Sequence, residues 1–86
     1  MKLLQEPIEV QTLRGVPHRV TWRHRAYPVR GIEEKWLYNG KWWVTAQLVG
    51  QARRYYRLEV ESPAGGDATM EVFEEEGGWV LARLQD

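Results

Sequence analysis

Cysteine is absent from this chain of 86 residues, so neither a disulfide nor a thiolate metal site can stabilise it. The sequence also lacks a long apolar run. Its longest uncharged apolar stretch, residues 42–49, is interrupted by Thr45 and Gln47 and is too short to span a membrane. Residues 1–5 do not contain the apolar segment of a signal peptide. Because the lack of cysteine also fits a reducing compartment, we expect a cytoplasmic protein with no membrane partner.

Residues that commonly perform catalysis are scarce. Ser62 is the only serine and lies in a loop-like Ser-Pro-Ala-Gly-Gly stretch, while His18 and His24 lie in an arginine-rich strand and turn. Three consecutive glutamates, residues 74–76, lack the spacing of a calcium loop, and the two Gly-Gly pairs lack the residues of a phosphate-binding loop. We therefore predict no catalytic residues, no metal ligands and no cofactor, and a protein that is not an enzyme.

The charges sum to zero, with 12 basic and 12 acidic residues, but their distribution is uneven. Residues 10–32 contain five arginines and no acid, whereas residues 58–82 contain seven acids and neither lysine nor arginine. Two interpretations remain open. The two segments lie together and neutralise each other, or the basic segment forms an open face that attracts an anionic partner.

Aromatic and β-branched residues dominate the remaining sequence. Five tryptophans, four tyrosines and one phenylalanine supply large apolar surfaces to a short chain. Turn signals separate the runs that contain them, at residues 14–15, 23–26, 39–40, 63–67 and 76–78. We therefore predict an all-β fold in which residues 1–86 form a single small domain. It is an antiparallel meander of about six to seven strands that makes a strongly curved sheet or half-open barrel.

Apolar alternation predicts the first hairpin. A two-residue turn at residues 24–25 or a four-residue loop at residues 23–26 places Trp22 opposite Tyr27 and Val20 opposite Val29. We favour the four-residue loop, because it avoids positive φ angles at non-glycine residues and keeps the proline of the return strand out of a hydrogen-bonded position.

The second hairpin is predicted at Asn-Gly, residues 39–40. A three-residue loop there sets Trp36 opposite Trp42 and Ile32 opposite Ala46, and a two-residue turn is the alternative. A slip of one residue exchanges the faces of the strand. We favour the three-residue loop because it buries a coherent apolar set: Ile32, Trp36, Trp42, Val44, Ala46 and Leu48.

Strands at residues 53–61 and 68–75 carry complementary charges. One register sets Arg57 against Glu71 and Arg53 against Glu75, which neutralises the basic strand on its own sheet. The last strand, residues 79–84, has apolar residues on both faces, so we expect both faces to be covered. The predicted core includes Trp22, Trp36, Trp42, Tyr56 and Leu58.

Several arginines alternate with aromatic residues, as in grooves that bind single-stranded nucleic acid. Tyr55 points outward between Arg53 and Arg57. In the favoured first hairpin, Arg19 lies opposite Arg30, with another arginine close by. The candidate interaction surface consists of Arg19, Arg23, Arg30, Arg53, Tyr55 and Arg57.

The order of the aromatic motifs resembles an uncharacterised bacterial family of small Trp-rich domains. The motifs are Val-x-Trp-Arg-His-Arg-x-Tyr-x-Val at 20–29, Trp36, Gly-Lys-Trp-Trp at 40–43, Arg-Tyr-Tyr-Arg at 54–57, Val-Phe at 72–73 and Gly-Trp-x-Leu at 78–81. Similar sequence occurs at the C-terminal end of ImuB-type proteins, the catalytically inactive Y-family polymerase relatives of mutasomes. The chain departs from the pattern at His24, where a glycine is expected, and at its Gln-Asp ending, where Tyr-Asp is expected. The resemblance implies an interaction module associated with DNA damage tolerance and transfers no catalytic residues.

On these grounds we predict a non-enzymatic protein-interaction module that binds a protein not yet identified. A single-stranded nucleic-acid-binding domain that uses arginine and tyrosine on a β-face is the alternative, and a small-molecule-binding or catalytic domain ranks third. Weak nucleic-acid binding and assembly into a homo-oligomer remain open.

Overall fold

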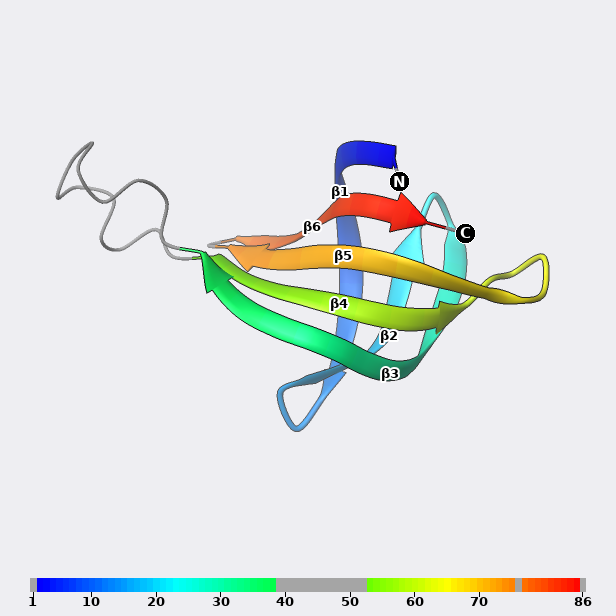
Figure 1. Ribbon diagram of the computed structural model, residues 1–86, viewed down its shortest axis with the longest axis horizontal. Helices are drawn as coiled ribbons and strands as arrows, with labels where there is room; N and C mark the ends of the chain where they lie inside the picture. The colour runs from blue at the N-terminus through cyan, green and yellow to red at the C-terminus, as the bar shows by residue number, and fades with distance from the viewer. Residues whose placement is uncertain (1, 39–52, 76, 86) are drawn as a thin grey trace, which may run out of the picture.

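Six antiparallel strands form a closed barrel in the computed structural model, in the order β1-β2-β3-β4-β5-β6 (Figure 1). The structure describes residues 2–38, 53–75 and 77–85. The strands are β1 (Lys2–Leu13), β2 (Val16–Trp22), β3 (Arg25–Tyr38), β4 (Arg53–Glu61), β5 (Asp67–Glu75) and β6 (Gly78–Gln85). The predicted all-β antiparallel meander is thus confirmed.

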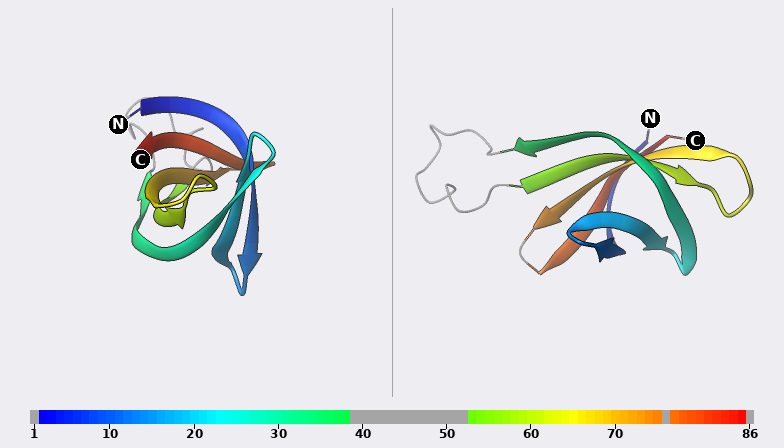
Figure 2. Two further views of the ribbon diagram at one scale, coloured as in Figure 1. Left: turned by 90° about the vertical axis from the view of Figure 1, so that its right-hand side faces the viewer. Right: turned by 90° about the horizontal axis from the view of Figure 1, so that it is seen from below.

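Two long, bent strands close the barrel. The first part of β1 pairs with β6 and its second part, from Glu9 onward, pairs with β2. In the same way β3 pairs first with β2 and then, from Val29 onward, with β4. As a result the β1–β2 pair crosses the second part of β3 and the strands β4 and β5 steeply (Figures 1 and 2). Because each bent strand belongs to two sheets, the meander becomes a barrel.

The core fills the inside of this barrel. Every second residue of β4 and β5 faces inward, as period-two alternation requires. Among the core residues, Val20, Leu58, Val60, Met70, Val72 and Leu81 have no exposed surface. Trp22 and Leu58 are buried and Tyr56 packs against the core, which confirms these three core predictions. Trp42 lies outside the described residues.

The first hairpin has a different register from the predicted one. Trp22 pairs with Arg25 and Val20 pairs with Tyr27, so the predicted pairs Trp22–Tyr27 and Val20–Val29 are wrong. The turn consists of only two residues, Arg23 and His24, with φ angles of 50° and 63°. Two successive left-handed residues make a primed turn, whose twist matches that of the flanking strands. The register is displaced by two residues, so each side chain keeps its predicted face.

This turn yields a prediction about stability. His24 has a φ of 63°, where a side chain costs about 1–2 kcal/mol and glycine does not clash. Replacing His24 with glycine is therefore expected to raise the melting temperature by several degrees, about 4–8 °C per kcal/mol gained. Gly15 has a φ of 79° in the β1–β2 turn, so Gly15→Ala should lower the melting temperature. A His24→Gly protein that melts no higher than wild type would contradict this account of the turn.

The carboxylate of Glu6 on β1 accepts hydrogen bonds from two residues at the end of β2 and in the turn that follows it. Trp22 Nε1 donates a hydrogen bond to Glu6 Oε1 over 3.2 Å, and Arg23 Nη2 donates to Glu6 Oε2 over 2.7 Å. The hydrogen bonds from Arg23 and then Trp22 lower the pKa of the Glu6 carboxyl below its ordinary value. Glu6 therefore connects the first part of β1 to the β2–β3 turn.

The lowered pKa of Glu6 gives a pH dependence of definite sign. A depressed folded-state pKa stabilises the fold above the ordinary pKa of 4.5, and this contribution is lost as the pH falls through the folded-state pKa. We expect Glu6→Gln to melt below wild type near neutral pH and the difference to shrink with acidification. Thermal melts of both proteins from about pH 7 down to about pH 3 test this, the lower end lying below the ordinary carboxyl pKa. A constant difference over that range would contradict the prediction.

β3 differs most from the sequence-based expectation. The Asn-Gly turn and the return strand of the favoured second hairpin, residues 39–48, lie outside the described residues. In the pairing of β3 with β4, Ile32 lies opposite Leu58 and Trp36 lies opposite Tyr55. A register shift between Ile32 and Glu34 marks a β-bulge, and one extra residue moves the following side chains to the other face. Hence Trp36 is half-buried on the outside of the barrel and Ile32 is 37% exposed, so their predicted burial in one core set is wrong.

The pairing of β4 with β5 agrees with the predicted register. Arg57 lies opposite Glu71, and Arg53 forms an ion pair with Glu75, with 3.5 Å between Nε and Oε2. β4 has the predicted limits, and β5 and β6 differ from prediction by one residue at the ends. In β6, Leu81 and Ala82 are adjacent and both buried, so apolar residues are covered on both faces, as expected.

Candidate interaction surface

An aromatic row crosses the outer face of the barrel. It consists of one residue from each of three neighbouring strands, paired directly across the sheet: Trp36, Tyr55 and Phe73. The Trp36 and Tyr55 rings are stacked, with centroids 5.2 Å apart and planes at 11°. Tyr55 and Phe73 are tilted, with centroids 5.0 Å apart. This is a geometry in which aromatic pairs attract beyond simple burial.

Two arginines of β4 flank the aromatic row. The guanidinium carbon of Arg53 lies 4.5 Å from the centroid of Phe73, and that of Arg57 lies 5.6 Å from the centroid of Trp36. Both contacts are within the range of cation–π attraction. Phe73 is only 1% exposed although it points away from the inner core cluster. The outer face therefore carries a small apolar cluster of its own.

A row of alternating charge runs parallel to the aromatic row, two residues further along β4. It consists of four residues that are paired from strand to strand: Glu34, Arg57, Glu71 and Arg83. Arg57 Nε donates a hydrogen bond to Glu71 Oε2 over 3.1 Å, and its Nη2 lies 3.0 Å from the same oxygen. Its Nη1 lies 3.1 Å from Glu34 Oε1. Arg83 Nε lies 3.7 Å from Glu71 Oε1. The charges in this row alternate from β3 to β6 and end on a cation.

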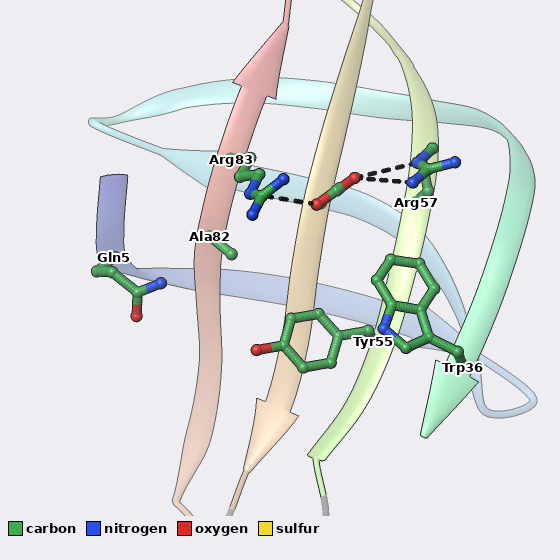
Figure 3. Close-up of a pocket in the computed structure, with 7 residues that line it drawn as sticks. Gln5, Trp36, Tyr55, Arg57, Ala82 and Arg83 are labelled. Atoms are coloured by element: carbon green, nitrogen blue, oxygen red, sulfur yellow. Dashed lines mark hydrogen bonds and ion pairs between the residues drawn. The ribbon is translucent and has the colours of Figure 1, made fainter. Parts of the chain in front are cut away.

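Glu71 is the buried member of this charge row. Its side chain is 7% exposed, whereas the side chain of Arg83 is 53% exposed. A buried carboxylate is costly unless it is paired, and here two guanidinium groups approach it from opposite sides. Figure 3 shows Arg57 on one side and Arg83 on the other, with dashed lines marking these contacts.

A hollow of about 290 Å³ opens between the two rows. Figure 3 shows Tyr55 and Trp36 on one side of it and Ala82 and Gln5 on the other. Two strand irregularities meet here. Ala82 is passed over where the β5–β6 register shifts, and Gln5, at a φ of 61°, lies where the β1–β6 register shifts. β-Bulges of this kind are over-represented beside functional sites.

The structure divides the six candidate residues into two groups. Arg53, Tyr55 and Arg57 lie together on the outer face, as predicted. The other three do not join them, and the predicted pairing of Arg19 with Arg30 is wrong because Arg19 lies opposite Gln11 and Pro28.

Acidic residues neutralise most of the candidate arginines. Arg30 lies 3.5 Å from Glu61 and 3.4 Å from Asp67, and Arg23 is bound to Glu6. With Arg53 on Glu75 and Arg57 on Glu71, four of these carboxylates come from the acidic segment of residues 58–82. Of these pairs, only those of Arg30 join the basic segment of residues 10–32 to the acidic segment, so mutual neutralisation of the two segments is shown for Arg30 alone.

Sequence reasoning did not assign Trp36, Phe73 or the hollow to this surface. Trp36 was placed in the core because the bulge in β3 leaves no clear sequence signal. Phe73 could have been found, because the register that sets Arg57 opposite Glu71 also sets Phe73 opposite Tyr55. The bulges at Gln5 and Ala82 depend on long-range pairing with β6 and β5, which no local pattern encodes.

These features define a small, closed, antiparallel β-barrel with an aromatic and charged outer surface. The family model described as Domain of unknown function (DUF6504) matches residues 1–86, and the chain belongs to this family. This agrees with the resemblance to an uncharacterised family, and the family description contains no link to ImuB-type proteins. No curated protein and no solved structure matches the chain. Within the described residues, no helix has the length and apolar character required to cross a membrane.

Proposed function

We propose that the protein is a non-enzymatic protein-interaction module and that its contact surface is the outer face of β3, β4 and β5. The observation that carries the proposal is the aromatic row on the outside of the barrel, whose three residues do not belong to the inner core cluster. Tryptophan, tyrosine and arginine are the residues that most often dominate the binding energy of protein interfaces. All three occur here within one cross-strand cluster.

The association with DNA damage tolerance is part of this proposal and is supported by the resemblance to ImuB-type proteins alone. It predicts that the partner is a component of a mutasome or of a replicative polymerase.

Affinity capture with matched variants tests the proposal. The wild-type protein, Tyr55→Ala and Leu13→Ala are immobilised and exposed to a lysate of the cells that produce the protein. Leu13 is 62% exposed at the β1–β2 hairpin, so it is a control for general stickiness. We expect one protein to bind wild type and Leu13→Ala equally and to lose about tenfold or more on Tyr55→Ala, as for a hot-spot residue. Equal recovery on all three would overturn the proposal.

Single-stranded nucleic acid is the second candidate partner, because the stacked Trp36–Tyr55 pair lies between two arginines of β4. Arg53 and Arg57 already engage carboxylates, which a phosphate would have to displace. We therefore expect dissociation constants no tighter than roughly 10⁻⁴–10⁻⁶ M near physiological salt, the non-specific range. Fluorescence anisotropy with a labelled oligonucleotide measures this. Sub-micromolar binding that is weakened by Arg53→Ala, Tyr55→Ala and Arg57→Ala would place nucleic acid first.

A further inference from the structure

We infer that two copies of the chain pair through the outer face of β3, β4, β5 and β6, about a two-fold axis that runs along the strands between β4 and β5. In this arrangement β4 of each copy lies over β5 of the other, and β3 lies over β6. Sheets that pack face to face in the aligned manner keep their strands within about 30° of each other, as this axis requires. The inference rests on the proposed function, because it names one partner of the same surface: a second copy of the chain.

The distribution of charge on β4 and β5 supplies the first argument. Two pairs of opposite charge cross these strands on the outer face, Arg57 with Glu71 and Arg53 with Glu75. In both pairs the arginine is on β4 and the glutamate is on β5. An axis between these strands exchanges β4 with β5, so each arginine lies across from a glutamate of the second copy. A two-fold interface requires a patch that is complementary to itself in this way.

The neighbouring strands continue this complementarity. Glu34 on β3 and Arg83 on β6 end the charge row with opposite signs, and the same axis places the Glu34 of one copy across from the Arg83 of the other. Both residues keep their partners within the chain, and their side chains are 55% and 53% exposed, so they also reach the second copy. Glu71 lies beside Arg83, but Arg57 of the second copy lies across from Glu71, so a cation faces each carboxylate of the row. An axis along the charge row would instead place like charges across from each other, which is costly.

The aromatic row supplies the second argument. The same axis places Tyr55 across from Phe73 of the second copy, and Trp36 across from Val80, the residue that pairs with Phe73 on β6. Trp36, Tyr55 and Val80 are each half-buried, so a second copy removes more of their apolar surface from water. The axis that opposes unlike charges therefore also brings apolar residues together.

The balance of charge on this face favours a second copy over other occupants. Its paired ionic side chains are three arginines and three glutamates: Arg53, Arg57, Arg83, Glu34, Glu71 and Glu75. A nucleic acid carries charge of one sign and would meet repulsion from the three glutamates. A second copy carries both signs in the matching order. The hollow of about 290 Å³ extends to Ala82 on β6, over which β3 of the second copy lies, so the second copy covers it.

An exchange of charge between two variants tests the inference. Sedimentation equilibrium is measured for wild type, Arg53→Glu, Glu75→Arg and an equimolar mixture of the two variants, from about 1 μM to about 1 mM. We expect wild type to form a reversible dimer in this range. Each variant alone places like charges across the axis at two sites, so its dimer should have a dissociation constant about tenfold higher or more. In the mixture the two substituted positions face each other with opposite charges, so dimerisation should return.

Matched variants control for net charge and for folding. Arg19→Glu and Glu9→Arg make the same changes of charge at exposed positions on β2 and β1, outside this surface, and should dimerise as wild type does. Thermal melts verify that each variant is folded. Glu34→Arg and Arg83→Glu repeat the exchange at a second pair of facing positions, and they decide the question if a variant of the first pair unfolds.

Three results would overturn the inference. They are a wild-type protein that stays monomeric up to about 1 mM, charge variants that dimerise as wild type does, and a mixture in which dimerisation does not return. None of them decides the proposed function, because the capture experiment with Tyr55→Ala detects a different protein from the lysate. Equal capture on all its variants would overturn the proposed function, and sedimentation would still decide whether the outer face pairs with its own copy.

Discussion

Replacing Leu58 with alanine is expected to lower the free energy of unfolding by about 2–5 kcal/mol. Leu58 has no exposed surface and lies in the middle of the inner core cluster, so truncation removes buried methyl groups and leaves a cavity. Domains of this size have only about 5–15 kcal/mol of total stability, so much of the protein would unfold under mild denaturant.

Leu37 provides the matched control for Leu58. It is 56% exposed on β3, and Leu37→Ala should change the free energy of unfolding by no more than about 0.5 kcal/mol. Urea titrations of both variants, followed by tryptophan fluorescence, measure the two values. Equal losses in the two variants would contradict the assignment of the inner face of β4.

Replacing Phe73 with alanine is expected to lower the free energy of unfolding by about 3–5 kcal/mol, although Phe73 lies on the outer face. Its ring is covered by Tyr55 and Arg53 and is 1% exposed, so its removal leaves a cavity beneath the aromatic row. Phe73→Leu should cost less than about 1.5 kcal/mol, because a smaller apolar side chain still fills most of the site.

A double-mutant cycle separates the outer cluster from the inner core. Phe73 and Tyr55 are in contact, so the losses from Phe73→Ala and Tyr55→Ala should not add. Phe73→Ala and the inner-face variant Met70→Ala should add more closely, since Met70 belongs to the inner cluster and Phe73 does not. A Phe73→Ala protein with wild-type stability would mean that the outer face carries no cluster of its own.

The parts of the fold that depend on local alternation were predictable from the sequence. Val20, Trp22 and Tyr27 occupy their predicted face, and Arg57 faces Glu71 because the faces and charges of β4 and β5 allow few other registers. Period-two patterns determine the face of each residue wherever one side is buried.

The errors arise at three features that hydrophobic alternation does not encode: a turn conformation, a β-bulge and a long-range strand pairing. The β2–β3 turn uses two left-handed residues, Arg23 and His24, whose types do not signal that conformation, so its register was displaced by two. A bulge in β3 places Trp36 on the outer face, and the hydrophobic pattern of a sequence does not indicate where a bulge occurs. Closure by β1 and β6 joins the two ends of the chain, a long-range contact that local sequence does not specify.

The candidate surface was predicted in part, because only some of its residues belong to a regular strand. Arg53, Tyr55 and Arg57 belong to one regular strand, so alternation alone placed them together. Arg19, Arg23 and Arg30 were grouped by the favoured register of the first hairpin, which is wrong, and two of the three pair with carboxylates elsewhere. Alternation within one strand was therefore a better guide to the surface than a register that depends on the type of turn.

The central proposal is that the outer aromatic row is the recognition surface. The NMR spectrum of the indole N–H groups, recorded with the captured partner added, tests it most directly. Trp36 belongs to the aromatic row, whereas the Trp22 indole donates to Glu6 near the β2–β3 turn and is an internal reference. The account predicts that the Trp36 signal shifts or broadens on binding while the Trp22 signal stays in place. A shift at Trp22 with an unchanged Trp36 signal would contradict it.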